Sequence, residues 1–155
     1  MLKWIELAWA ENSDELKREL EKGSYYDYPD LFKLAIEVVL NPYIGEKTLL
    51  DTLNADRITT IDDGDWQGTQ IFIVPTSAYQ PSADEYYWTF VWYGSCSGCD
   101  ALQAANGYKR KTERVQAWSL LCLNMLQRLS RLTGKNDQDG NPYYTEPKIE
   151  GEDDE

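Results

Sequence analysis

The stretch YYWTFVWYGSCSGCDALQ, residues 86–103, decides the fold that we predict for this chain. Aromatic and β-branched residues dominate its first half, which is typical of a β-strand. At the strand period of two, large apolar side chains fall on both faces: Trp88, Phe90 and Trp92 on one, and Tyr87, Val91 and Tyr93 on the other. We therefore expect a central strand with both of its faces covered by other elements.

A glycine-rich turn with two cysteines follows this strand. Gly94 and Gly98 flank the CxxC pair Cys96 and Cys99. Asp100 comes next, where a helix that begins near residue 101 needs an acceptor for its free backbone amides. The pattern predicts a strand, a tight turn and a short helix that ends at the Asn-Gly pair of residues 106–107.

The residues before this stretch predict a hairpin that completes a small sheet. A short strand at about 58–62, a turn at Asp63-Gly64-Asp65 and a return strand at 67–74 lie in sequence order, and Pro75 ends the second strand. Because neighbouring strands usually pair, we expect three antiparallel strands in meander order.

Helices are predicted on both sides of the sheet segment. Residues 2–10 have a helical apolar pattern, and 12–22 either continue that helix or form a second one with a capping box at Asn12 and Glu15. A further helix starts at Pro29 and should end at Asn41-Pro42. A short helix at 46–54 would bury its leucines, Leu49, Leu50 and Leu53.

The longest helix is predicted near the end of the chain, over residues 108–132. Its apolar residues are spaced alternately by three and four: Val115, Trp118, Cys122, Met125, Leu129 and Leu132. The predicted fold class is α+β: a three-stranded antiparallel sheet in the middle of the chain, packed by N-terminal helices and this long C-terminal helix. Residues 1–134 should form a single domain, and 135–155 a polar acidic tail that is partly disordered.

The composition narrows the classes of function. The 155 residues carry a net charge of −12, which repels nucleic acid and favours basic protein partners. Residues 108–135 hold seven basic residues and one acid, which we interpret as intramolecular charge balance. There is no histidine, so the commonest general base and metal ligand is missing. With no signal peptide and no apolar run of about 20 residues, we expect a cytoplasmic protein with reduced thiols and no membrane contact.

The CxxC pair is the sharpest local signal for chemistry. Cys96 and Cys99 at the start of a helix fit a redox dithiol, because backbone amides there stabilise a thiolate. They also fit two of the four ligands of a zinc ion, although only Cys122 and acids remain to complete the set, and Cys122 lies on the apolar stripe of the last helix. The interpretation that we favour is a structural turn with the thiols packed beneath it.

Acidic and aromatic residues give two further candidate sites. Asp62, Asp63 and Asp65 around Gly64 could hold a divalent cation, but Asp and Gly are also what a hairpin turn requires, and we favour the turn. Tyrosines and one tryptophan exceed what a small core needs and are typical of protein contacts. This candidate interaction surface consists of Trp66, Tyr79, Tyr86, Tyr25, Tyr26 and Tyr28. The aromatic surplus also allows a homodimer.

Two stretches, IDDGDWQGTQIFIVP at residues 61–75 and YYWTFVWYGSCSGCDALQ, resemble a family of small uncharacterised proteins encoded by tailed bacteriophages and prophages. The resemblance extends over about residues 57–130, including the start of the long helix. It implies an accessory protein that works in the bacterial cytoplasm, and it implies no activity and no catalytic residues.

Our leading hypothesis is a non-enzymatic phage accessory protein that binds a basic protein partner. Its acidic surface would inhibit or modulate a host nucleic-acid-handling or defence complex by occupying a groove that otherwise holds phosphates. The alternative is a thiol redox or metal-binding protein that uses Cys96 and Cys99, with zinc as the one cofactor considered. A third hypothesis is a metal-dependent enzyme built on Asp62, Asp63 and Asp65. We assign no catalytic residue and expect no direct contact with nucleic acid.

Overall fold

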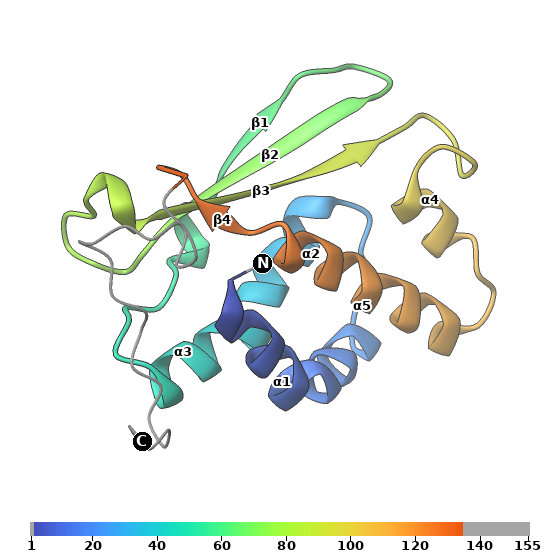
Figure 1. Cartoon of the computed structure of the whole chain (residues 1–155). Helices are drawn as coiled ribbons and strands as arrows, with labels where there is room; N and C mark the ends of the chain where they lie inside the picture. Colours follow the sequence, from blue (N-terminus) through green and yellow to red (C-terminus); the bar gives the residue numbers. More distant parts are fainter. Residues whose placement is uncertain (1, 135–155) are drawn as a thin grey trace.

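The computed structural model describes residues 2–134 and has an α+β fold, in which helices pack on one face of an antiparallel sheet (Figure 1). The sheet has four strands in the order β1-β2-β3-β4. Their bounds are Thr59–Asp62 for β1, Gly68–Pro75 for β2, Tyr86–Tyr93 for β3 and Ser130–Arg131 for β4. Within residues 2–134, no helix is both long enough and apolar enough to cross a membrane. The predicted acidic tail lies outside the described residues.

The predicted hairpin and central strand are confirmed, but the prediction of three strands is wrong. Strand β3 lies between β2 and β4. The last helix, α5, spans Lys111–Gln127 instead of 108–132, and the chain beyond it pairs with β3 through Ser130 and Arg131. Leu129 is buried in this arrangement, and it would also be buried if the helix continued to residue 132. Its apolar character therefore could not show whether the chain there is helix or strand. Leu132, predicted on the helix stripe, is 47% exposed.

The N-terminal residues form one continuous helix, α1, from Lys3 to Glu21. Asn12 does not cap a second helix, because its side-chain amide donates a hydrogen bond to the carbonyl of Val39 at 3.0 Å. This bond joins α1 to the next helical segment, so Asn12 stabilises tertiary packing.

The second helical segment continues past the proline that was predicted to end it. Helix α2 (Tyr28–Ala35) passes through a π-helical turn (Ile36–Leu40) into α3 (Asn41–Lys47). Proline lacks an amide hydrogen, and its ring collides with the carbonyl four residues earlier in an ordinary helix. The wider π turn lies directly before Asn41 and Pro42, so the carbonyl four residues before Pro42 lies in the π turn and not in an ordinary α-helical turn.

The predicted helix at 46–54 does not form. Helix α3 ends at Lys47, and Leu49 is 73% exposed instead of buried. The side chain of Asn41 bonds both backbone groups of Leu53, each at 2.9 Å, and Leu53 forms a β-bridge with Thr76. These tertiary contacts hold the segment extended, although Leu53 itself is buried as expected.

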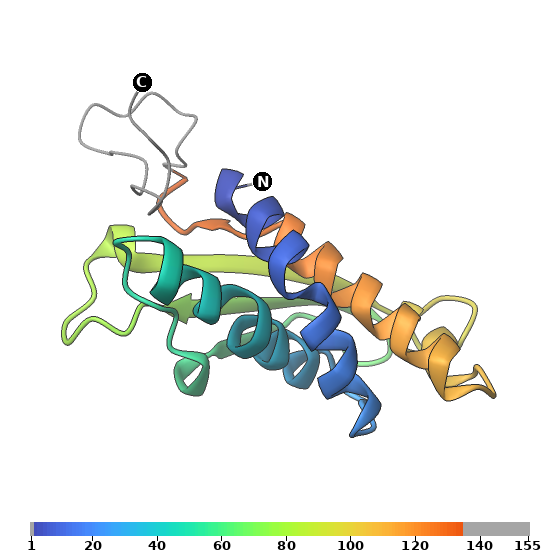
Figure 2. The ribbon, with the colours of Figure 1, turned by 90° about the horizontal axis from the view of Figure 1, so that it is seen from below.

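The two faces of the sheet have different environments. Seen from below, the helices lie in front of the sheet (Figure 2), and the face toward them carries the buried Phe72, Val74 and Val91. On the other face no helix among residues 2–134 covers Trp88, Phe90 and Trp92, and Trp92 is 62% exposed. The expectation that both faces of β3 are covered is therefore wrong.

Candidate functional site

A cleft of about 660 Å³ lies at the end of the sheet where the β1–β2 hairpin turns. Three segments enclose it: the hairpin turn, the residues that precede α2, and the turn from β3 into helix α4 (Ala101–Asn106). The lining residues used below are Tyr26, Asp27, Tyr28, Asp65, Trp66, Gln70, Tyr93 and Asp100. Residues of two candidate sites, the acidic cluster and the aromatic interaction surface, thus come together with the predicted helix cap Asp100.

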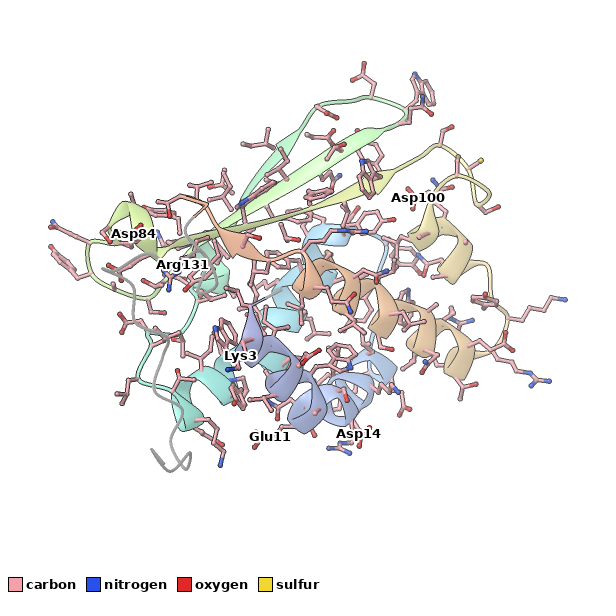
Figure 3. All side chains as sticks on the ribbon, in the orientation of Figure 1. Lys3, Glu11, Asp14, Asp84, Asp100 and Arg131 are labelled. Atoms are coloured by element: carbon pink, nitrogen blue, oxygen red, sulfur yellow. The ribbon has the colours of Figure 1, made fainter. Side chains whose placement is uncertain are left out.

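Asp100 anchors the floor of the cleft at the start of α4, where Figure 3 labels it. As predicted, it caps the helix, with its Oδ1 atom accepting from the backbone amides of Leu102 at 2.9 Å and Gln103 at 3.3 Å. The same oxygen accepts from the Tyr28 hydroxyl at 2.8 Å, and Oδ2 accepts from the Gly94 amide at 3.0 Å. Asp100 is buried, so one carboxylate ties α2, α4 and the end of β3 together.

The Tyr28 hydroxyl has little freedom to ionise in this environment. Burial raises its pKa well above the ordinary value, and the hydrogen bond to Asp100 raises the pKa further. The hydroxyl also accepts from the Leu102 amide at 3.1 Å. Tyr28, a candidate interaction residue, is therefore a structural part of the cleft wall.

The hairpin turn is held by two of its own carboxylates. Asp62 Oδ1 accepts from the Gly64 amide at 3.0 Å and from the Tyr93 hydroxyl at 2.5 Å, while Asp63 Oδ1 accepts from the Thr69 amide at 2.6 Å. The bond from Tyr93 lowers the pKa of Asp62 and raises the pKa of Tyr93 to about 12. A Cβ atom at Gly64 would stand 2.0 Å from the Gln67 carbonyl oxygen, so the turn needs glycine there.

These bonds favour the turn interpretation of the acidic cluster over a cation site. Asp62 and Asp63 use their oxygens within the hairpin, and Asp65 alone faces the cleft. In the part of the chain that the structure describes, no group of three or more Cys, Asp or Glu side chains stands close enough together to hold a metal ion.

The cysteine pair lies on the surface, in the turn between β3 and α4. Cys96 and Cys99 are both exposed, so the expectation that the thiols pack beneath the turn is wrong. The Cys99 sulfur accepts from the Cys96 amide at 3.0 Å, and the Cys96 thiol and nearby amides lower the pKa of Cys99. A Cβ atom at Gly94 would stand 2.5 Å from the Cys99 carbonyl oxygen, so glycine lets the turn close onto the strand. Cys122 is buried in the core, as predicted, and its pKa is raised to about 12 by burial.

The predicted interaction residues separate into three locations. Trp66 and Tyr26 line the cleft and are 80% and 74% exposed. Tyr25 packs edge-on against Trp118, with ring centroids 5.2 Å apart. Tyr86 begins β3, and Tyr79, 94% exposed, lies in the β2–β3 loop at the opposite end of the sheet (Figure 1). Of the six predicted interaction residues, Trp66 and Tyr26 are the two that line the cleft and have exposed rings.

The charged side chains that line the cleft are acidic. Asp27, Asp65 and Asp100 are among its lining residues, and none of the lining residues that the structure describes is a lysine or arginine. Two basic residues of the α5 segment make contacts elsewhere: Lys111 lies 5.0 Å from the Trp118 ring, and Arg128 lies 5.4 Å and 5.0 Å from the rings of Phe90 and Trp92. The cleft is therefore suited to a cationic group and not to phosphate.

Sequence reasoning missed Asp27, Gln70 and Tyr93 as residues of this site. Tyr93 could have been identified from the pairing register of the predicted strands. In that register Tyr93 pairs with Gly68 and so stands beside the acidic turn. Asp27 and Gln70 carried no comparable signal. Comparison of the chain with protein-family models, with curated proteins and with solved structures finds no match.

Proposed function

We propose that this chain is a non-enzymatic accessory protein that binds a protein partner with a basic surface, and that the cleft receives a lysine or arginine side chain of that partner. The observation that supports the proposal is the pairing of exposed rings with carboxylates. Trp66 and Tyr26 present open faces, and Asp27 and Asp65 line the same cleft. Within residues 2–134, the lining contains no basic residue that would repel the bound side chain.

The chemistry of such a site is well defined. A cation over an aromatic ring gains roughly 0.5–1 kcal/mol at an exposed site and about 2 kcal/mol or more when the site is desolvated. The aliphatic stem of lysine or arginine would pack on the tryptophan, while its charged end meets the carboxylates. Because the whole chain has a net charge of −12, long-range attraction would also speed the encounter with a basic partner.

The partner class follows from the same charge argument together with the phage resemblance. A basic protein surface that normally holds phosphates would be blocked by an acidic protein docked on it. In a phage accessory protein, the target would be a nucleic-acid-handling or defence complex of the host, in the bacterial cytoplasm. This proposal assigns the chain no catalytic step.

The cleft residue whose loss should weaken binding most is Trp66. A short arginine-rich peptide, titrated against the full chain by calorimetry, should bind the Trp66→Ala variant about tenfold more weakly than the unaltered protein. A lysine-rich peptide should behave similarly, a glutamate-rich peptide should not bind, and added salt should weaken the binding of both basic peptides.

The matched control is Trp92→Ala, because Trp92 is also exposed but lies on the face of the sheet that no helix of residues 2–134 covers. This variant should retain full peptide affinity. Equal affinity of the Trp66→Ala and unaltered proteins would show that the peptide binds by diffuse charge attraction, and the cleft would lose its assigned role.

A thiol redox function is the second candidate, and the exposed Cys99 with its lowered pKa favours it. In that reaction the Cys99 thiolate would attack a substrate disulfide and release one substrate thiol. The Cys96 thiolate would then attack the mixed disulfide and release the second thiol. The chain would be oxidised to a Cys96–Cys99 disulfide, and the substrate would be reduced by two electrons.

Native alkylation with iodoacetamide, read by mass spectrometry, tests this candidate. Cys99 should react faster than Cys96, and Cys122 should stay unmodified because it is buried. A Cys99 rate no greater than that of free cysteine at the same pH would remove the redox candidate. Oxidised glutathione should then also fail to form the Cys96–Cys99 disulfide.

A further inference from the structure

The open face of the sheet carries a second binding surface, separate from the cleft. Because directly paired residues of antiparallel strands point to the same side, the register assigns three rows to this face. They are Thr59 and Ile61 on β1, Thr69, Ile71 and Ile73 on β2, and Trp88, Phe90 and Trp92 on β3. We call these residues the open sheet face.

This face is apolar and nearly uncharged. The rings of Trp88 and Phe90 stack at 5.7 Å and those of Phe90 and Trp92 meet edge-on at 5.1 Å. Trp92 and Ile61 are 62% and 48% exposed. The guanidinium group of Arg128 lies over the rings of Phe90 and Trp92, so one positive charge reaches the β3 row of this face. A contiguous apolar patch of this kind marks an interaction surface.

We infer that the open sheet face pairs with the same face of a second copy of this chain. A two-fold axis parallel to the strands, between β2 and β3, would place β3 of each copy over β2 of the other. Since paired residues share a level along the strands, Trp88 of one copy would meet Ile73 of the other, and Phe90 would meet Ile71. Large aromatic side chains would thus fill the space above smaller aliphatic ones in both halves of the interface.

The charges on the two copies match in the same arrangement. Arg128 stands at the level of Phe90 and Trp92 on the β4 side of the sheet. The two-fold axis would bring β1 of the second copy over this region, with its Ile61 at the level of Phe90. The turn that follows β1, with Asp63, would then stand near Arg128.

The size of the face indicates a weak dimer. Strands β2 and β3 have eight residues each. At about 3.3 Å per residue and about 4.8 Å between strands, the face measures roughly 25 by 15 Å. A symmetric pair would bury roughly 750 Å², which is below the roughly 1,000 Å² of a stable specific interface, so we expect a weak dimer with a dissociation constant of roughly tens of micromolar or more.

Sedimentation equilibrium of the full chain over a concentration series tests this inference. The unaltered protein should form a dimer, and Trp92→Asp should raise its dissociation constant roughly a hundredfold. Tyr79→Asp is the matched control, because Tyr79 is 94% exposed and lies outside the open sheet face. This control should dimerise normally, and both variants should keep the circular dichroism spectrum of the unaltered protein.

The dependence on salt concentration distinguishes dimerisation through the open sheet face from peptide binding in the cleft. Two copies of net charge −12 repel each other over a longer range than the single Arg128 contact attracts, so added salt should strengthen the dimer. Added salt should weaken the binding of a basic peptide in the cleft. A variant that loses one property and keeps the other would show which surface has failed.

A full chain that stays monomeric up to about 1 mM would overturn the inference. So would a Trp92→Asp variant that dimerises as well as the unaltered protein. If the chain is monomeric, the NMR resonance of the Trp92 indole N–H tests what else covers the open sheet face. A shift of that resonance when Tyr143 and Tyr144 are replaced by alanine would assign the face to the chain's own tail, and no shift would leave it to a different protein.

Discussion

Replacing Asp100 with alanine is expected to lower the free energy of unfolding by about 3 kcal/mol. The variant removes a helix cap and leaves the Tyr28 hydroxyl and the Gly94 amide without their acceptor. Both groups are buried beside the carboxylate, so water that enters from the cleft would only partly replace the acceptor that they lose. Urea denaturation followed by circular dichroism gives the value directly.

Two further variants make this prediction specific. Asp84→Ala alters an exposed acid at the other end of the sheet (Figure 3), and we expect a change within about 0.5 kcal/mol. Asp100→Asn keeps one acceptor oxygen and should lose less stability than Asp100→Ala. If the alanine variant were as stable as the Asp84→Ala control, the carboxylate could not be the link that holds the cleft together.

Replacing Trp118 with alanine is expected to lower the free energy of unfolding by about 4 kcal/mol, within the usual range for truncating a buried tryptophan. Trp118 is 1% exposed. Its indole nitrogen donates to the Asn106 side chain at 2.8 Å, and Asn106 in turn donates to the Tyr25 carbonyl at 2.8 Å. Tyr25 precedes Tyr26, so this chain of contacts also supports one wall of the cleft.

The matched control for this variant is Trp66→Ala, because Trp66 is 80% exposed. The control should leave the free energy of unfolding within about 0.5 kcal/mol of the unaltered protein, while it weakens peptide binding. Trp118→Ala should lower both. A Trp118→Ala protein with unchanged stability would mean that the α1–α2 connection does not depend on this side chain.

The candidate site could be predicted from the sequence only in its local parts. Asp100 follows a strand and precedes a helix, which is sufficient to predict a cap, and Asp-Gly pairs predict the hairpin turn. Neither pattern says that the cap and the turn face each other across one cleft. That proximity depends on the sheet register, which brings Tyr93 to Asp62, and on the packing of α2, which brings Tyr28 to Asp100.

The same distinction explains the helices that were predicted with wrong bounds. Pro42 does end ordinary helices, but here a π-helical turn accommodates it, because Ile36, Val39 and Leu40 are all buried against the core. The leucines at 49–53 have helical spacing, but Asn41 holds Leu53 in an extended bridge. In both segments tertiary contacts outweighed a local preference, which is worth less than about 1 kcal/mol for a leucine and about 3 kcal/mol for a proline inside a helix.

The sequence by itself determined the α+β class, the hairpin, the strand at residues 86–93, the cap at Asp100 and the burial of Cys122. These features depend on residues near in the chain or on apolar character, and both can be read along the sequence. The tertiary structure alone decided the fourth strand, the exposure of Cys96 and Cys99, the open sheet face and the meeting of Trp66, Tyr26, Asp27 and Asp65 in one cleft. Apolar periodicity states that a side chain prefers to leave water, but only the packed chain determines whether another part of the same molecule covers it.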